Sequence, residues 1–297
     1  MKNLQTILRG TGVAIITPFT AQKAVDYPAL ERVINHIING GAEYIVTLGT
    51  TGETPTLSKN EKLEIVHFTL EKVNNRVPVV VGIGGNNTQS VIDDLQSYPL
   101  TQVTAVLSAA PYYNKPSQQG IYEHYKAIAS ASTKPVILYN VPGRTGRNIA
   151  STTTLRLAHE VPNIAGIKEA SGDFQQCMDI LRDRPTDFLV VSGDDAISLP
   201  LIALGMEGVI SVAANAFPKE FSTMVRFCLN GNFKEAKPIH YQLLQAFDYM
   251  FVENNPAGVK AFLHHLTLIQ NYTRLPVVPV SAELEQKIKN WLHQFQQ

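Results

Sequence analysis

The chain has 297 residues, and its 25 Lys and Arg residues balance 25 Asp and Glu residues to a formal net charge of zero. A neutral chain without a basic stripe is not expected to bind nucleic acid. The 44% of apolar residues suffices for a large core, whereas Cys177 and Cys228, the only cysteines, supply neither a zinc framework nor a disulfide scaffold and suit the reducing cytoplasm.

Short apolar runs rich in β-branched residues recur along the chain, and each predicts a buried β-strand. Segments with helical periodicity lie between them. One such segment, residues 58–73, carries its apolar side chains on a single face and begins with a capping box of Ser58 and Glu61. The eight predicted strands are residues 13–17, 44–48, 77–83, 103–109, 136–140, 164–168, 188–192 and 208–212.

This alternation of strands and helices predicts an α/β fold with a parallel sheet and right-handed crossovers. Eight such units close into a (β/α)8 TIM barrel, whereas an open doubly wound sheet is the alternative. The glycine-rich segment 82–87 has Asn87 in place of the third glycine of a dinucleotide fingerprint, and it follows the third strand rather than the first. We therefore expect the barrel and interpret this segment as a turn.

The pattern changes after residue 217, where three helical segments follow without intervening strands. They are residues 234–251, residues 255–268 with Pro256 at the first helical position, and residues 281–295 with Ser281 as the cap. We expect a catalytic barrel over 1–217 and a C-terminal helical extension over 218–297 that packs on it. Because the sequence has no run of roughly 18 apolar residues and no apolar leader, we expect a soluble cytoplasmic protein without a membrane partner.

Lys168 ends the sixth predicted strand, where a strand covered on both faces offers no water to an ammonium group. Desolvation disfavours the charged form and favours the neutral amine, which condenses with a ketone to form a Schiff base. The alternative is a structural lysine whose stem packs on the strand while its head reaches water. The polar residues at the other strand ends decide between these two interpretations.

Active sites of (β/α)8 barrels lie at the carboxyl ends of the strands, so the polar residues there should form one set. Tyr139, one strand from Lys168, has the chemistry to move protons during carbinolamine loss and carbon–carbon bond formation. The hydroxyls of Thr50 and Tyr113 can extend a relay from it toward solvent. In the alternative interpretation, the tyrosines are core or interface aromatics and the threonines are caps of a turn.

Two further groups at these ends suit carboxylates. The hydroxyl of Thr51 and neighbouring amides can hold one small carboxylate, and the guanidinium of Arg144 can hold a second; alternatively Arg144 pairs with a surface acid. We expect Asp194 and Asp195 to cap the next helix. No cluster of histidines and carboxylates follows the strands, so we expect no metal and no cofactor. The site therefore suits two small acids, one bound covalently.

Six motifs in order resemble the dihydrodipicolinate synthase family of pyruvate-dependent Schiff-base aldolases, and the resemblance covers essentially the whole chain. The motifs are residues 49–53, 111–114, 139–142, 144–146, 166–170 and 192–195. The resemblance implies that Lys168 condenses with pyruvate, that Tyr139 is the general acid–base, and that Thr50 and Tyr113 complete the proton relay. The implied substrate contacts are Thr51 for the pyruvate carboxylate, Arg144 for the carboxylate of L-aspartate 4-semialdehyde, and the backbones of Gly193 and Ile210 around the pyruvate pocket.

The reaction implied by the resemblance is attack of the pyruvate enamine on the semialdehyde, followed by ring closure through its amino group. The product is 4-hydroxy-tetrahydrodipicolinate, on the route to diaminopimelate and lysine. In this family Tyr113 crosses from a neighbouring subunit, so activity depends on a dimer, and two tight dimers form a homotetramer.

Two alternatives to the synthase remain. One is another pyruvate-dependent aldolase, such as N-acetylneuraminate lyase or a keto-deoxy sugar acid aldolase; the other is a catalytically silent barrel that binds a small acid. Residues 144–146 favour the synthase, since a neutral sugar chain has no use for Arg144 there. A silent barrel is expected to lose Lys168 or Tyr139, and both are present.

The sequence departs from lysine-inhibited members of the family, in which a glutamate after the third strand and nearby histidines line the inhibitor cavity. Ser90 takes the glutamate position, Lys59 and Lys62 take the histidine positions, and Asn86 and Tyr112 are retained. A unit-charge pair at about 4 Å is worth roughly 1 kcal/mol in water and about 4 kcal/mol near a protein surface. The loss of this attraction lowers the affinity for lysine by a factor of about 10 to 1000, which predicts weak or absent lysine feedback.

Overall fold

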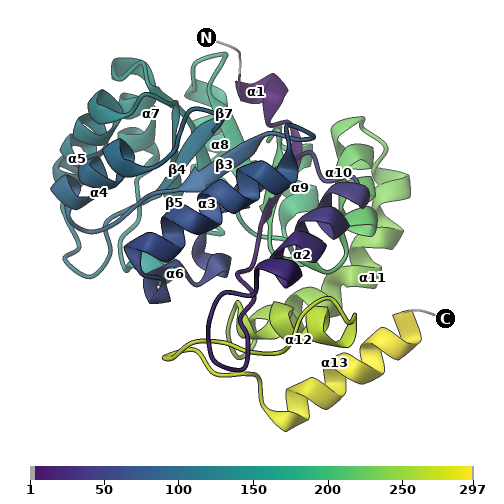
Figure 1. The fold of residues 1–297 in the computed structure, drawn as a ribbon. Helices are drawn as coiled ribbons and strands as arrows, with labels where there is room; N and C mark the ends of the chain where they lie inside the picture. Colours follow the sequence, from purple (N-terminus) through teal and green to yellow (C-terminus); the bar gives the residue numbers. More distant parts are fainter. Residues whose placement is uncertain (1–3, 296–297) are drawn as a thin grey trace.

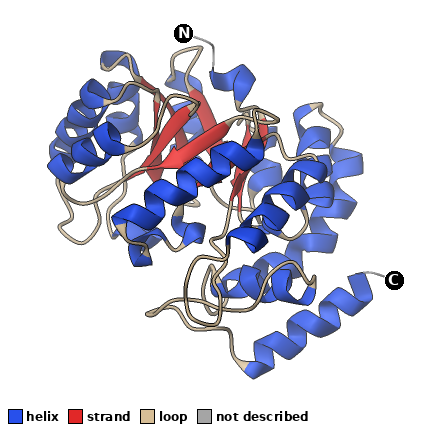
Figure 2. Ribbon diagram, in the orientation of Figure 1, coloured by secondary structure: helices blue, strands red, loops and turns tan. Residues whose placement is uncertain are grey.

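In the computed structural model, which describes residues 4–295, eight parallel strands close into a barrel in chain order. The sequence prediction of a (β/α)8 barrel is thus confirmed. The strands lie at the centre of the molecule and the helices surround them (Figure 2). The strands are β1 (Gly10–Ala14), β2 (Tyr44–Thr47), β3 (Val79–Gly82), β4 (Ala105–Ala109), β5 (Val136–Asn140), β6 (Ile164–Glu169), β7 (Leu189–Ser192) and β8 (Gly208–Ser211).

Helices connect successive strands on the outside of the barrel, and further helices follow β8 (Figure 1). Among residues 4–295, no helix has the length and apolarity to cross a membrane. The helices up to β8 are α1 (Leu4–Ile7), α2 (Tyr27–Asn39), α3 (Lys59–Val73), α4 (Thr88–Ser97), α5 (Gln118–Ala131), α6 (Pro142–Thr145), α7 (Ser151–Glu160), α8 (Phe174–Asp183) and α9 (Ser198–Ala203). Three 3-10 turns accompany them: η1 (Thr50–Gly52), η2 (Thr54–Thr56) and η3 (Ala213–Asn215).

Seven of the eight predicted strands overlap the observed strands with shifts of at most two residues, but the first was placed three residues too late. Strand β1 begins at Gly10, in a glycine-rich stretch that β propensity does not identify. Gly12 is required there because a Cβ at this position would lie 2.1 Å from a ring carbon of Tyr44, which fills the barrel interior. The register pairs Gly12 with Tyr44, so the missing side chain on β1 makes room for the large one on β2.

The barrel separates two apolar layers, one between the strands and the helices and a smaller one inside the barrel. Alternate residues of each strand point to opposite layers. The interior layer contains Tyr139 of β5, Val191 of β7 and Ile210 of β8. The register of β6 aligns Lys168 with Tyr139 on one side and Val191 on the other, which directs the lysine side chain into the barrel interior.

Helix α3 starts with the predicted capping box, in which Ser58 Oγ accepts from the amide of Glu61 and the Glu61 carboxylate accepts from the amide of Ser58. Helix α12 (Ala257–His265) starts two residues later than predicted, and Pro256 is its N-cap rather than its first helical residue. The cause is Asn255, whose side-chain amide and backbone carbonyl both form hydrogen bonds away from the helix.

The helices after β8 are α10 (Pro218–Leu229), α11 (Phe233–Phe251), α12 and α13 (Ala282–Phe295), and Ser281 caps the last as predicted, with its Oγ accepting from the amide of Leu284. Helix α10 contacts β1, β8 and α2, whereas α11, α12 and α13 contact one another. An aromatic cluster joins these helices to the barrel, since the ring of Phe217 lies 5.4 Å from that of Trp291. The division into a barrel over 1–217 and an extension over 218–297 stays a prediction. Residues 1–3 and 296–297 of these two ranges lie outside the described residues.

Candidate active site

Lys168 lies inside the carboxyl end of the barrel and is 4% exposed. Its Nζ is 4.3 Å from the centre of the Tyr139 ring, on the neighbouring strand. Within the described part of the chain, Lys168 forms no ion pair. The adjacent Glu169 points to the other face of β6, where its buried carboxylate accepts from the amides of Asn140, Ser171 and Gln176. The amine is therefore buried beside a phenol and is not paired with a carboxylate.

Gly193, directly after β7, makes room for the lysine side chain. A Cβ at residue 193 would lie 2.8 Å from Cε of Lys168 and 2.6 Å from Cβ of Ala170. The Gly193 amide continues the barrel ladder by donating to the carbonyl of Glu169 at 2.7 Å. Ile210 lies deeper in the barrel interior and is buried.

The loop after β2 places Thr50 and Thr51 above the barrel. The 3-10 turn η1 follows Gly49, and Thr51 is buried. Asn255 Nδ2 donates to Thr51 Oγ1 at 3.1 Å. The segment that follows β1 fixes the backbone of this loop, because Thr17 Oγ1 donates to the carbonyl of Gly52 at 2.7 Å.

Arg144 lies in α6, the short helix that follows β5. Its Nη2 donates to the backbone carbonyl of Asn255 at 3.3 Å, and the rest of the guanidinium remains exposed. Asn255 thus contacts both residues predicted to bind carboxylates, through its side chain on Thr51 and its carbonyl on Arg144. The role of Asn255 was not predicted, since an asparagine before a proline indicates a helix start and says nothing of contacts with a distant loop.

A cavity of about 700 Å³ opens above Lys168. Asp194 and Asp248 also line it, so the wall carries both signs of charge, and Phe247 and Phe251 of α11 add apolar surface on the far side. The predicted site residues that it brings together are Thr50, Thr51, Tyr139, Arg144, Lys168 and Gly193.

The model of the "Dihydrodipicolinate synthetase family" matches residues 7–295. This chain belongs to that family. It is 51% identical over 292 residues to the 4-hydroxy-tetrahydrodipicolinate synthase of Phocaeicola vulgatus, with 98% of each chain covered, and 49% identical over 288 residues to that of Parabacteroides distasonis, with 97% of each covered. The structure superposes with a TM-score of 0.94 on a chloride-inhibited dihydrodipicolinate synthase from Acinetobacter baumannii in complex with pyruvate. The two sequences are 38% identical, and the superposition covers 97% of this chain and 99% of the other.

One residue that the family resemblance assigns to the proton relay lies outside this cavity. Tyr113 is 88% exposed, has a φ of +70°, and lines neither the cavity above Lys168 nor the neighbouring one. A single subunit therefore does not bring its own Tyr113 to Tyr139 and Thr50. The expectation that this side chain enters the site of a second subunit stays a prediction.

A second cavity, of about 390 Å³, shares Thr50, Tyr139 and Arg144 with the first. Of the predicted regulatory residues, Lys62 and Tyr112 line it. The other three lie apart: Lys59 is half exposed and 3.9 Å from the Asp94 carboxylate, Ser90 is exposed in the first turn of α4, and the carbonyl of Asn86 accepts from Asn114.

Asp195 does not cap the next helix as predicted. Its buried carboxylate instead accepts from the amides of Val212 and Ala213, at 3.0 and 2.8 Å, and so ties the end of β7 to the end of β8. Burial raises the pKa of this carboxyl to about 6, although the bonds from these amides oppose the shift. The side chain of Asp194 accepts from the nearby amide of Ala196, at 3.0 Å.

Proposed function

We propose that the protein is a 4-hydroxy-tetrahydrodipicolinate synthase, which condenses pyruvate with L-aspartate 4-semialdehyde through a Schiff base on Lys168. The observation that carries the proposal is the buried amine of Lys168, 4.3 Å from the Tyr139 ring centre at the base of a cavity. The names of the relatives and the pyruvate complex of the Acinetobacter enzyme support the same reaction. They do not favour a sugar acid aldolase.

The first half of the reaction forms the covalent intermediate. The neutral amine of Lys168 attacks the ketone carbon of pyruvate, and the carbinolamine loses its hydroxyl as water to leave a protonated imine. Tyr139, whose ring lies against the amine, supplies the proton for that water and then receives a proton from the methyl carbon, which generates the enamine. Thr51 and the amides of η1 hold the pyruvate carboxylate.

The second half forms the new carbon–carbon bond. The enamine carbon attacks the aldehyde carbon of the semialdehyde, and its oxygen takes a proton from the relay of Tyr139, Thr50 and Tyr113. The amino group of the semialdehyde then attacks the imine carbon, closes the ring and releases Lys168. Arg144 receives the semialdehyde carboxylate, because its exposed guanidinium lines the mouth of the cavity.

The exposed Tyr113 supports assembly of the site between subunits, within a homotetramer of paired dimers. Mixed dimers test this proposal. A subunit carrying Tyr113→Phe and one carrying Lys168→Ala are each expected to be nearly inactive, but together they restore one complete site if Tyr113 crosses between subunits. Lack of activity in the isolated mixed dimer would show that the tyrosine acts within its own chain.

The buried free cysteines Cys177 and Cys228 support a reducing location, for which we propose the cytoplasm. We also propose weak or absent inhibition by lysine. Lys62 brings a positive charge into the second cavity, and Ser90 supplies no carboxylate. A steady-state assay that shows half-inhibition at millimolar lysine would refute this proposal.

Borohydride trapping tests the function as a whole. Incubation with pyruvate and borohydride is expected to add the mass of a reduced pyruvate imine to the peptide that contains Lys168. The Lys168→Ala variant, treated in parallel, is expected to gain no mass. An active protein that forms no adduct would exclude the Schiff-base mechanism, and an adduct without turnover of the semialdehyde would assign the site to a different aldolase.

A further inference from the structure

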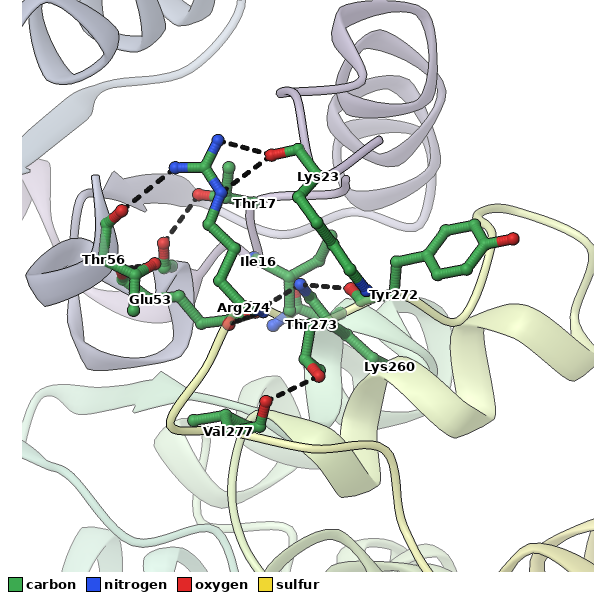
Figure 3. A network of polar contacts seen from close by, with 12 residues as sticks. Ile16, Thr17, Lys23, Glu53, Thr56, Lys260, Tyr272, Thr273, Arg274 and Val277 are labelled. Atoms are coloured by element: carbon green, nitrogen blue, oxygen red, sulfur yellow. Dashed lines mark hydrogen bonds and ion pairs between the residues drawn. The ribbon is translucent and has the colours of Figure 1, made fainter. Parts of the chain in front are cut away.

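A fully buried ion pair lies behind the loop that carries Thr50 and Thr51. Lys260, in α12, has no exposed surface, and its Nζ binds the carboxylate of Glu53, the last residue of that loop (Figure 3). The same Nζ donates to the carbonyl of Tyr272 at 3.0 Å and lies 4.2 Å from the centre of the Phe19 ring. Burial lowers the pKa of Lys260 to about 8, although the Glu53 carboxylate opposes this shift.

Stability alone does not explain such a pair. The desolvation of two charges offsets their attraction, so apolar side chains of the same volume are often equally stable in its place. A buried ion pair does fix geometry, because each partner accepts few alternative positions. The geometry that this pair can fix is that of Glu53 and its loop.

Glu53 holds an unusual backbone conformation through its side chain. Its φ is +53°, in the left-handed region that a glutamate rarely adopts. One carboxylate oxygen binds Lys260, and the other accepts from the backbone amide of Arg274 at 3.0 Å. Both partners come from the C-terminal part of the chain, as Figure 3 shows, so Glu53 is fastened from outside its own loop.

Residues distant in the chain hold the loop of residues 49–53, and most of them are C-terminal. Thr17 fixes the carbonyl of Gly52, Asn255 binds the hydroxyl of Thr51, and the pair of Glu53 with Lys260 fixes the end of the loop. The C-terminal anchors determine where the Thr51 hydroxyl and the η1 amides lie relative to Lys168, which is carried by a different element.

We propose that Glu53 and Lys260 are positioning residues for pyruvate: their ion pair holds the loop 49–53 where its hydroxyl and amides receive the substrate carboxylate. The inference rests on the function proposed above. Neither side chain lines the cavity above Lys168, and the pairing of β5 with β6 aligns Lys168 with Tyr139.

The predicted signature follows from what the loop binds. The pyruvate carboxylate is held equally in the ground state and the transition state, so loosening its site raises KM for pyruvate and leaves kcat unchanged. Weakening one hydrogen bond to a charged group is expected to raise the half-saturating pyruvate concentration about tenfold. A purely structural pair lowers the melting temperature and changes neither constant in the folded protein.

The experiment uses the double variant Glu53→Gln/Lys260→Met, which removes both charges and leaves neither unpaired, together with the single variant Lys260→Met. The half-saturating pyruvate concentration is measured by borohydride trapping, with near-UV circular dichroism as the check of folding. The matched control is Arg184→Met/Glu207→Gln, which removes a mostly buried ion pair of 2.8 Å at the opposite end of the barrel. The expected result is a rise of about tenfold in the double variant and less than about twofold in the control, with kcat unchanged in both.

Three results would overturn the inference. One is an unchanged half-saturating concentration in the folded variants, another is an equal rise in the control, and the third is failure of both variants to fold, which assigns the pair to stability alone. The function proposed above is tested separately, because it predicts an adduct on Lys168 in the wild-type protein. If the wild type forms the adduct and the double variant has an unchanged half-saturating pyruvate concentration, the positioning role is rejected and the Schiff-base mechanism stands.

Discussion

Replacing Gly193 by alanine tests how closely the reactive amine is positioned. The new Cβ would lie 2.8 Å from Lys168 Cε and 2.6 Å from Ala170 Cβ. Carbon atoms in favourable contact are about 3.5–4.0 Å apart, so the lysine chain must move by about 1 Å. The flexible lysine chain can move away from the new methyl group, whereas Ala170 has no rotatable side chain, so relief of that contact requires a backbone shift near residue 193.

A displacement of this size is large for a nucleophile. Misplacing a reacting group by about 1 Å lowers the rate about 100-fold, equivalent to about 2.7 kcal/mol in the barrier. The added methyl group also overpacks the interior, which destabilises a core by about 1–3 kcal/mol. We expect Gly193→Ala to remain folded, to melt at a lower temperature, and to form the pyruvate imine about 100-fold more slowly.

The assay is quenched-flow borohydride trapping at saturating pyruvate, so that binding of pyruvate does not limit the rate. The control is Gly143→Ala, because a Cβ at residue 143 has no atom within 4 Å. Its rate is expected to match the wild type. A folded Gly193→Ala protein that forms the imine within about twofold of the wild-type rate would refute the steric argument.

Three further predictions address the remaining groups. Tyr139→Phe keeps the ring beside Lys168 but removes the phenol, so turnover should fall about 100-fold or more while the fold is retained, and steady-state kinetics that equal the wild type would remove the residue from proton transfer. Arg144→Ala should raise KM for the semialdehyde and spare the pyruvate adduct; loss of the adduct would show that this guanidinium serves pyruvate instead. Asp195→Asn tests the buried carboxyl, whose pKa of about 6 in the folded protein lies above the unfolded value of about 3.8. The folded wild type therefore binds more protons than the unfolded chain between these values. Its free energy of unfolding falls as pH rises from about 4 to 6, by about 3 kcal/mol at most. Asparagine should flatten that part of the melting-temperature profile relative to wild type, and parallel profiles would contradict the assignment.

The parts of the structure that were predictable are those with local signals. Seven strands follow from apolar runs, and Lys168 and Tyr139 follow from their places at the ends of two of them. Strand β1 was misplaced because Gly12 contributes space rather than apolar surface, and its need for space comes from Tyr44 on the next strand.

The missed parts depend on residues far apart in the chain. Asn255 and Lys260 lie 204 and 207 residues from Thr51 and Glu53, their partners in the loop, and no periodicity or motif links the members of either pair. The interpretation of Asp195 failed for a similar reason: a helix cap is a local bond, whereas this carboxylate binds amides 17 and 18 residues away. Sequence patterns thus placed Lys168 and Tyr139 at the ends of neighbouring strands and missed the contacts that hold the loop of residues 49–53.

The long separation of Glu53 from Lys260 has a consequence during synthesis on the ribosome. Translation proceeds at about 5–20 residues per second, so the carboxylate of Glu53 leaves the ribosome about 10–40 s before the ammonium 207 residues later can reach it. By the end of that interval the nascent chain carries all eight barrel strands and Lys168, whereas the loop of residues 49–53 still lacks its bond to Lys260. A growing polypeptide therefore contains Lys168 well before it contains the residue that fastens this loop.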